Sequence, residues 1–330
     1  MKILMASSID HAAIEALERS HDVLRAFNGT EEQLCSVIDD REALIFRSGV
    51  QISATVMDRA PQLRLLVRAG SGLDNVDVEH ATRRGIRIVR VPGSSAQPVA
   101  EFTFALLLSL VRQVSLGDRL LRQGHWPKAQ LGGPLVTGKT LGIVGVGNIG
   151  RRVGELAVAW GMRAIGCVAV PSDAISTALA ARGIELTDFE TVVSQADFLC
   201  LHVPLDHVTH HMVDARVLSH MKQGSYLINV ARGGVVDEKA LYAELVEGSK
   251  LRGAAIDVHE SEGEGSISPF GELPNVVLTP HIGAMALDAQ RLIGARVVAL
   301  VAAHQQGELE KTLRPDELVQ QEMTINEGEL

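Results

Sequence analysis

Three segments in the second half of the chain place reactive side chains directly after apolar runs. Arg232 lies in Asn-Val-Ala-Arg-Gly-Gly, His281 lies in Thr-Pro-His-Ile-Gly, and the segment 253–262 carries acids from Asp257 to Glu262. An arginine fork binds a carboxylate and polarises a carbonyl, whereas a histidine exchanges a proton near neutral pH. A carboxylate on the second ring nitrogen would fix the tautomer of that histidine. Beside a nicotinamide, this set would suffice for hydride transfer to or from a 2-oxo or 2-hydroxy acid.

Each of these residues also has an ordinary structural explanation. An arginine can cap a helix, a surface acid can be merely solvated, and the chain contains 12 histidines. The ends of successive parallel strands meet at one edge of an open α/β sheet, where ligands bind. The coincidence of all three groups at predicted strand ends therefore favours a site.

A nicotinamide cofactor is indicated by residues 140–168, where a glycine-rich turn joins an apolar run to a helical pattern and a second apolar run. In this strand–turn–helix–strand setting, Gly145 permits a tight turn, Gly147 lets the backbone approach a pyrophosphate, and Gly150 lets helix and strand pack closely. Free N–H groups at the helix start would hold the phosphates. The predicted cofactor contacts of the turn are Gly145, Gly147, Asn148, Ile149 and Gly150.

The same unit lacks the usual group for the adenosine ribose. NAD-binding units carry Asp or Glu at the end of the second strand, and NADP-binding units often place an Arg nearby. That position falls at or near Val168, and the nearest acid, Asp173, lies beyond Pro171. We therefore expect NAD as the cofactor and keep NADP as the alternative.

Length and composition are those of an ordinary globular protein with two domains. The chain has 330 residues and a formal net charge of −9, which argues against a general nucleic-acid surface. The first residues form too short an apolar run for a signal peptide, and no run is long enough to span a bilayer. His207, His210 and His211 have helix-compatible metal spacing but no evident acid or thiol partner. We expect a cytoplasmic protein without a metal site.

Residues 1–92 alternate short apolar runs with amphipathic segments, a pattern that predicts a parallel sheet with helices on both faces. The predicted strands are 3–6, 23–24, 43–46, 63–67 and 86–91, and the predicted helices lie near 10–19, 31–38, 53–60 and 77–84. Thr30 and Gln33 form a capping-box pair, and Asp77 is a candidate N-cap. Residues 93–96 are predicted to form a hinge.

A single long helix is predicted from Val99 to about Gln123, followed by an exposed glycine- and proline-rich arm over 124–139. This helix is apolar on more sides than one core contact requires. We therefore predict a homodimer that forms through residues 99–139.

The second domain is predicted to continue with strands at 198–203, 226–229, 253–258 and 276–278. A helical run over 284–304 would return the chain to the first domain, and 305–330 would form a strand and tail. The predicted fold is α/β, with two doubly wound Rossmann-like domains. A dinucleotide-binding domain, 97–284, is inserted into a flavodoxin-like substrate domain, 1–96 and 285–330.

Several motifs together carry a resemblance that covers residues ~45–300. They are Arg68-Ala-Gly-Ser-Gly-Leu-Asp-Asn-Val-Asp77, Pro92-Gly-Ser-Ser-Ala-Gln-Pro-Val-Ala-Glu101, the glycine turn, His202-Val-Pro204-Leu, Asn229-Val-Ala-Arg-Gly-Gly, Ala255-Ile-Asp257-Val and Thr279-Pro-His-Ile-Gly. In these motifs the chain resembles the D-isomer-specific 2-hydroxy-acid dehydrogenases, and among them the short-form phosphoglycerate dehydrogenases.

The resemblance implies a role for each matched residue. The implied catalytic residues are Arg232, Glu262 and His281. Further implied cofactor contacts are Val168, Val203, Pro204, Ala231, Asp257 and Gly283, of which the last two would lie near the nicotinamide amide. The implied substrate contacts are Arg47, Arg68, Ser71 and Gly72, with backbone N–H groups of the 70–72 loop binding the carboxylate.

The activity implied by the resemblance is reversible hydride transfer between NAD(P) and a D-2-hydroxy acid, with His281 as acid and base. Arg47 and Arg68 favour a phosphorylated substrate, so oxidation of D-3-phosphoglycerate to 3-phosphohydroxypyruvate is the first hypothesis. Reduction of glyoxylate, hydroxypyruvate or another 2-oxo acid is the alternative. A hypothesis of a different class is an NADH-sensing, corepressor-like binding protein.

The chain departs from the family pattern at three positions. Val168 replaces the expected acid, Gly263 follows Glu262 where proline is usual, and His259 stands where an aromatic residue is common. The second departure predicts a looser loop around the catalytic acid, and the third could perturb the site.

Overall fold

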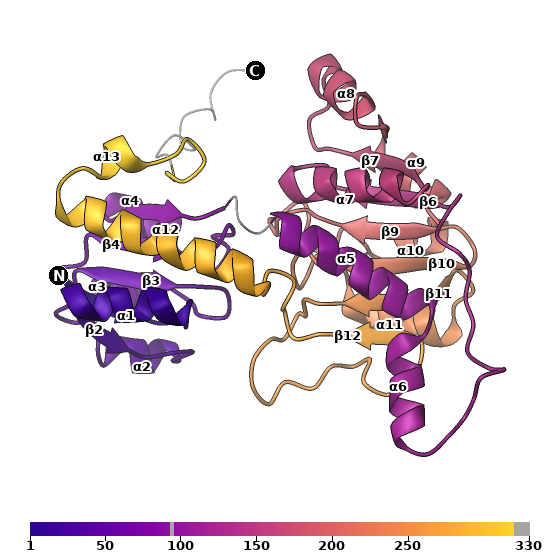
Figure 1. Cartoon of the computed structure of the whole chain (residues 1–330), viewed down its shortest axis with the longest axis horizontal. Helices are drawn as coiled ribbons and strands as arrows, with labels where there is room; N and C mark the ends of the chain where they lie inside the picture. The colour runs from indigo at the N-terminus through magenta and orange to yellow at the C-terminus, as the bar shows by residue number, and fades with distance from the viewer. Residues whose placement is uncertain (93–95, 320–330) are drawn as a thin grey trace. The chain divides into compact units, whose positions relative to one another are not determined.

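The computed structural model describes residues 1–92 and 96–319. The chain divides into two compact units, the first formed by Met1–Ser95 with Met285–Leu330 and the second by Ala96–Ala284. Each unit contains a parallel sheet flanked by helices, so the predicted pair of Rossmann-like α/β domains is confirmed (Figure 1). Of the predicted hinge, residues 93–95 lie outside the described residues, as do residues 320–330 of the predicted tail.

The first unit has a five-stranded parallel sheet in the order β2-β1-β3-β4-β5. This is the strand order of flavodoxin-like folds. Its strands are β1 (Lys2–Met5), β2 (Asp22–Arg25), β3 (Ala43–Phe46), β4 (Leu65–Arg68) and β5 (Arg87–Arg90). Its helices are α1 (His11–Ser20), α2 (Glu31–Cys35), α3 (Ala54–Asp58), α4 (Val78–Arg83), α12 (Leu287–Gln305) and α13 (Leu309–Thr312). Leu318 also forms an antiparallel bridge with Val89 beside the sheet.

Local sequence signals account for the helix starts of this unit. The capping box of α2 is confirmed, because Thr30 accepts from the backbone N–H of Gln33 and the Gln33 side chain accepts from that of Thr30. Asp77 caps α4 as predicted. Helix α12 packs on α1, where a Cβ on Gly294 would lie 2.8 Å from that of Ala13, so only glycine allows this approach.

The second unit has a seven-stranded parallel sheet in the order β12-β11-β10-β9-β6-β7-β8. The order reverses between β6 and β9, which is the switch point at which doubly wound sheets bind ligands. Its strands are β6 (Thr140–Val144), β7 (Arg163–Cys167), β8 (Ile184–Leu186), β9 (Phe198–Leu201), β10 (Ser225–Asn229), β11 (Leu251–Ile256) and β12 (Val276–Leu278). Its helices are α5 (Ala96–Val111), α6 (Val114–Arg122), α7 (Asn148–Ala159), α8 (Asp173–Ala180), α9 (Phe189–Gln195), α10 (Ala215–His220) and α11 (Glu238–Glu247).

The predicted single helix from Val99 to Gln123 is wrong, because the chain breaks between α5 and α6. Gln113 adopts a left-handed backbone conformation with φ 53°, which interrupts the helical hydrogen bonds. Helix α5 packs on α7 and on strands β10, β11 and β12 of its own unit, which explains its apolar surface. Helix α6 buries none of its residues.

Within the described residues, no single helix has the length and apolar character to cross a membrane. Helices α5 and α6 reach that length and composition together, but they are bent by 60° at their junction.

Candidate active site

The glycine turn between β6 and α7 has the close contacts that its spacing predicts. Gly145 has φ 92°, and a Cβ there would lie 2.7 Å from the carbonyl oxygen of His202. A Cβ on Gly150 would lie 2.2 Å from the carbonyl oxygen of Gly145, so glycine is needed for helix and turn to pack. By contrast, a Cβ on Gly147 would meet nothing within 4 Å, which leaves space beside the backbone at the middle of the turn.

This open space lies at the start of α7, where an anion is favoured. Gly147 is the N-cap of the helix and no side chain caps it, so the N–H groups of Asn148 and Ile149 are available to a ligand. The turn is tied to the end of β7, because the N–H groups of Gly145 and Val146 both donate to the carbonyl of Cys167, at 3.0 and 3.2 Å. The turn therefore fits a dinucleotide pyrophosphate.

Val168 is the first residue after β7, beside the glycine turn, and its side chain is partly buried against the core. The next acid, Asp173, stands in the first turn of α8, where Ser172 is the N-cap. The strand end that usually presents a carboxylate to the ribose thus presents an apolar side chain.

The segment after β9 borders the turn from the other side. Val203 packs beside Gly145, where an added Cβ would lie 2.8 Å from a methyl of Val203, and Pro204 follows it. Both ring nitrogens of His202 are buried and have no hydrogen-bond partner among the described residues. Burial lowers the pKa of His202 to about 3, so this imidazole is neutral at physiological pH.

The reactive groups follow three strands that are neighbours in the sheet. Arg232 comes after β10, the acids from Asp257 to Glu262 come after β11, and His281 comes after β12. Because the strands are parallel, their carboxyl ends lie at one edge. The sheet order therefore brings the three segments to the same edge, as their positions in the sequence predict.

His281 and Glu262 form a directly bonded pair. Nδ1 of His281 lies 2.8 Å from Oε2 of Glu262. Burial raises the pKa of Glu262, but the hydrogen bond and charge of His281 outweigh it and hold this pKa below its ordinary value. An ionised Glu262 accepts a hydrogen bond from the Nδ1–H group of His281. This bond fixes the tautomer of the ring and leaves Nε2 of His281 to exchange a proton with a ligand.

Asp257 organises the loop that carries His281. Its buried carboxylate accepts hydrogen bonds from Oγ1 of Thr279 at 2.6 Å and from the N–H groups of Ile282 and Gly283 at 2.9 Å each. The N–H of His281 donates to the backbone carbonyl of Asp257 at 2.7 Å. His281 itself has φ 54°, a left-handed conformation that is costly for a residue other than glycine. These bonds hold it there.

The Arg232 loop is fastened to the same edge. A Cβ on Gly233 would lie 1.8 Å from the carbonyl oxygen of His259, so the two loops touch through their backbones. The N–H of Ala231 donates to Oδ1 of Asn229 at 3.1 Å, and Arg232 donates to the carbonyl of Ala231 at 2.7 Å. This loop presents an arginine beside the Glu262 segment.

The predicted substrate residues all belong to the first unit. Arg47 follows β3 and is partly buried, and its guanidinium lies 3.1 Å from the sulfur of Met285. Burial lowers the pKa of Arg47 from its ordinary value. Arg68 is buried, and its Nε donates to the carbonyl of Gly72 at 2.7 Å. Arg68 thus holds the 70–72 loop, in which Ser71 donates to the carbonyl of Pro92 at 3.1 Å.

The sequence matches the family profile described as D-isomer specific 2-hydroxyacid dehydrogenase, NAD binding domain, over residues 104–283, which is more than half of the chain. The chain belongs to the D-isomer specific 2-hydroxyacid dehydrogenases. The resemblance predicted from the motifs is confirmed, and the glycine turn of the second unit lies within the part of the chain that matches the family's NAD binding domain.

Relatives of known name carry several activities. The chain is 38% identical over 310 residues to D-3-phosphoglycerate dehydrogenase of Methanocaldococcus jannaschii, a match that covers 94% of this chain and 58% of that protein. It is also 38% identical over 276 residues to hydroxypyruvate reductase of Thermotoga maritima, covering 81% of this chain and 86% of that protein. Among solved structures, D-lactate dehydrogenase from Aquifex aeolicus, complexed with NAD and lactic acid, has a TM-score of 0.83 at 27% identity, covering 97% and 99% of the two chains. The chain thus spans little more than half of the first of these relatives.

The departure at Gly263 has a structural explanation in this chain. Gly263 has φ 124° and Gly265 has φ 86°, and proline, whose φ is fixed near −65°, cannot occupy the first of these positions. The loop after Glu262 therefore follows a path that the family's usual proline would not allow.

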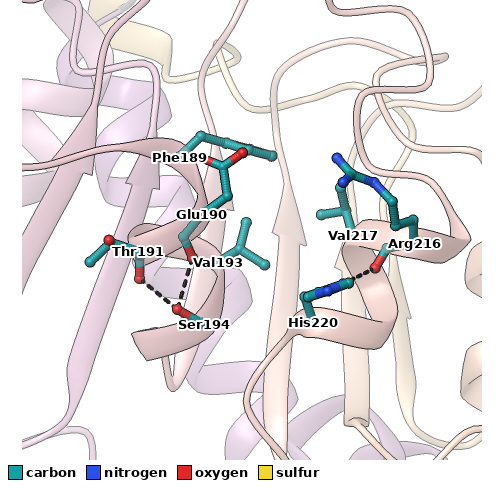
Figure 2. A pocket seen from close by; sticks show the side chains of 8 residues that line it. All are labelled: Phe189, Glu190, Thr191, Val193, Ser194, Arg216, Val217 and His220. Atoms are coloured by element: carbon teal, nitrogen blue, oxygen red, sulfur yellow. Dashed lines mark hydrogen bonds between the residues drawn. The ribbon is translucent and has the colours of Figure 1, made fainter.

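A cavity of about 300 Å³ is lined by residues of α9 and α10. Figure 2 shows Phe189, Glu190 and Val193 on one side of it and Arg216 and His220 on the other. None of the predicted site residues lines it, and His220 already bonds the carbonyl of Arg216 at 2.6 Å. Across residues 1–92 and 96–319, no group of three His, Cys, Asp or Glu side chains gathers as a metal site.

Sequence reasoning missed two groups that position the site. The motif around His281 indicates no role for Thr279, although its hydroxyl donates to Asp257. No motif includes Glu238, the first residue of α11, yet its carboxylate lies against the segment that carries Glu262. A threonine two residues before the predicted catalytic histidine is the only signal that could have indicated the first of these.

Proposed function

We propose that this protein oxidises a D-2-hydroxy acid with NAD, and that D-3-phosphoglycerate is the acid. The 2.8 Å contact between His281 and Glu262, at the strand edge that also carries Arg232, is the observation that supports the reaction. The name carried by the Methanocaldococcus relative supports the substrate.

In this mechanism NAD, when bound, accepts the hydride that leaves the carbinol carbon. Nε2 of His281 takes the proton of the substrate hydroxyl, while Glu262 stabilises the resulting imidazolium through Nδ1. The guanidinium of Arg232 binds the carboxylate and polarises the oxygen that becomes the carbonyl. In the reverse direction His281 returns the proton, so one pair serves both directions.

Arg47 is proposed to bind the phosphate of the substrate. Its side chain is partly buried, and no acidic side chain bonds it among the contacts of the described residues, in contrast to Arg41 and Arg87, which are paired with acids. A desolvated guanidinium gains most from a bidentate anion. A phosphate supplies such an anion.

Arg47→Ala is expected to raise the KM for D-3-phosphoglycerate by ~10–100-fold, the size of a lost charge-assisted hydrogen bond, and to change that for glyoxylate much less. Initial rates measured with both acids would check this. Equal increases for the two acids would contradict the phosphate-binding role.

The second candidate function is reduction of a small 2-oxo acid such as hydroxypyruvate or glyoxylate. It is favoured by one observation, because the match to the Thermotoga hydroxypyruvate reductase covers 86% of that protein, against 58% for the Methanocaldococcus enzyme. Absorbance of the reduced nicotinamide would distinguish the two, with D-3-phosphoglycerate, D-glycerate and D-lactate in one direction and hydroxypyruvate and glyoxylate in the other. Turnover of phosphoglycerate supports the first proposal, and turnover confined to the reverse direction supports the second.

Val168→Asp is expected to tighten NADH relative to NADPH by about 10-fold or more, because a carboxylate at the end of β7 would accept from the ribose hydroxyls and repel a 2′-phosphate. Titration of both reduced cofactors by fluorescence would measure the ratio. An unchanged ratio of the two affinities would show that another group binds the ribose hydroxyls.

The active form is proposed to be a homodimer. The support is the exposed apolar surface of α6 and the arm, where Trp126 and Leu135 are 79% and 73% exposed. Light scattering of the purified protein would give its mass, and a monomer at micromolar concentration would refute this.

A further inference from the structure

His259 lies next to the pair formed by His281 and Glu262, in the segment that carries Glu262. Its side chain is only 14% exposed, and its Nε2 lies 3.0 Å from the carbonyl oxygen of Thr279. A carbonyl can only accept, so Nε2 carries a proton. The other nitrogen, Nδ1, is buried and has no hydrogen-bond partner among the described residues. Nδ1 is therefore the atom at which this imidazole can gain a proton.

The group nearest to Nδ1 is a carboxylate. Oε1 of Glu238, at the start of α11, lies 3.9 Å from it, within ion-pair distance, and the Glu238 side chain is only 13% exposed. Glu238 is held in place by a reciprocal pair of bonds. The N–H of Glu260 donates to Oε1 of Glu238 at 3.0 Å, and the N–H of Glu238 donates to Oε1 of Glu260 at 3.2 Å.

Glu238 lies in a strongly negative part of the site. Burial raises its pKa, and the carboxylates of Glu260 and Glu262 raise it further. A proton bound between Glu238 and His259 relieves the repulsion among these carboxylates, whether Oε1 of Glu238 or Nδ1 of His259 carries it.

His259 also contacts the catalytic acid directly. Its backbone N–H donates to Oε1 of Glu262 at 3.1 Å, while Oε2 of Glu262 bonds His281 at 2.8 Å. The two carboxylate oxygens of Glu262 are thus engaged by two histidines, one through its main chain and one through its ring.

We propose that Glu238 and His259 form a second carboxyl–imidazole pair that tunes the first. Glu238 favours a protonated His259, and the positive charge of that ring beside Glu262 weakens the hold of Glu262 on the proton of His281. Glu238 and His259 are positioning residues, since neither is required to touch the substrate. The kinetic consequence rests on the proposed function, whereas the proton on His259 does not.

Several charged groups surround this pair and enter its titration. Those on the contacting segments are Glu260 and Glu262 beside it, His281 beyond Glu262, His211, whose Nε2 lies 3.0 Å from Oε1 of Glu260, and Arg232, whose loop touches the His259 backbone through Gly233.

The proton can be observed directly by 15N NMR of histidine-labelled protein at full length, without cofactor or substrate. His259→Phe keeps a ring of similar size and identifies the His259 resonances by their disappearance. We expect His259 to titrate in the wild type and its midpoint to move down by about 1 pH unit or more in Glu238→Gln, as for removal of an opposite charge within ~4–6 Å. An unmoved midpoint, or a wild-type His259 that stays neutral down to pH 5, overturns the proposal. His259→Phe supplies the assignment independently of Glu238→Gln, so a wild-type ring that stays neutral overturns the proposal even if Glu238→Gln fails to fold.

Kinetics supply the second test. In both Glu238→Gln and His259→Phe, the pH at which oxidation of the hydroxy acid reaches half its plateau should rise by roughly 0.5 unit, because Glu262 then holds the His281 proton more firmly. The KM for the acid should change little.

Glu185→Gln is the matched control for these variants. Glu185 lies on the outer strand β8 and pairs with Arg163 of β7, so removal of its charge should leave the pH profile unchanged. A shift as large in the control would overturn the proposal. If His259 titrates as expected by NMR but no hydroxy acid is turned over, the proposed activity is refuted and the Glu238–His259 pair is supported.

Discussion

Replacement of His281 by alanine is expected to lower kcat for hydroxy-acid oxidation by ~10²–10⁴-fold, the usual contribution of a positioned general base. The alanine removes the ring whose Nδ1 is bonded to Glu262 and whose Nε2 is proposed to exchange the substrate proton. It leaves the glycine turn and the strand ends around it unchanged, so NADH should bind with nearly its original affinity. Steady-state rates and a fluorescence titration of NADH on the same preparation would measure both effects.

His220→Ala provides the matched control for this prediction. His220 lies at the end of α10 beside the cavity of Figure 2, and its removal takes one imidazole from the same unit without touching the strand edge. Loss of NADH binding in His281→Ala would contradict the role given to His281. Retention of more than about a tenth of the wild-type kcat would show that another group moves the proton.

The fold follows from local patterns that the sequence displays openly. Alternating apolar runs and amphipathic segments predict both parallel sheets, and the glycine turn predicts where the second sheet begins its nucleotide-binding half. Strand β8, only three residues long, was missed, because Ile184–Leu186 has one buried residue and no periodicity to detect.

The break between α5 and α6 could not be predicted from composition. Residues 112 and 113 are Arg and Gln, neither of which is a helix breaker, and the apolar pattern continues across them. The left-handed backbone at Gln113 instead reflects tertiary packing, since α5 buries against its own sheet while α6 does not. No local signal in the sequence marks the position of the break.

The candidate site likewise contains residues that the sequence could identify and residues that it could not. Arg232, Glu262 and His281 could be identified because each belongs to a motif at a strand end. The second pair could not, because Glu238 and His259 are brought together by the packing of α11 against the loop after β11 and lie in no common motif. Their sequence separation carries no periodic signal.

Asp257→Asn is expected to destabilise the second unit by about 1–3 kcal/mol and to lower kcat by ~10²-fold. The carboxylate accepts three bonds, two on Oδ1 and one on Oδ2, from donors that all belong to the His281 loop. An amide has only one accepting oxygen, so in either orientation its NH2 group faces a donor and at least one of these bonds is lost. His281, already in a costly left-handed conformation, would then leave its position opposite Glu262.

Thermal unfolding and initial rates would measure the two effects of Asp257→Asn, and Asp214→Asn serves as its control. Asp214 caps α10 and accepts a single bond, from the N–H of Val217 at 2.9 Å, which an asparagine oxygen accepts equally well. The same chemical change should therefore be nearly silent at Asp214 and severe at Asp257. If Asp257→Asn unfolds at the wild-type temperature and keeps its kcat, the loop is held by the Asp257 backbone bond to His281 alone, and the carboxylate has a different role.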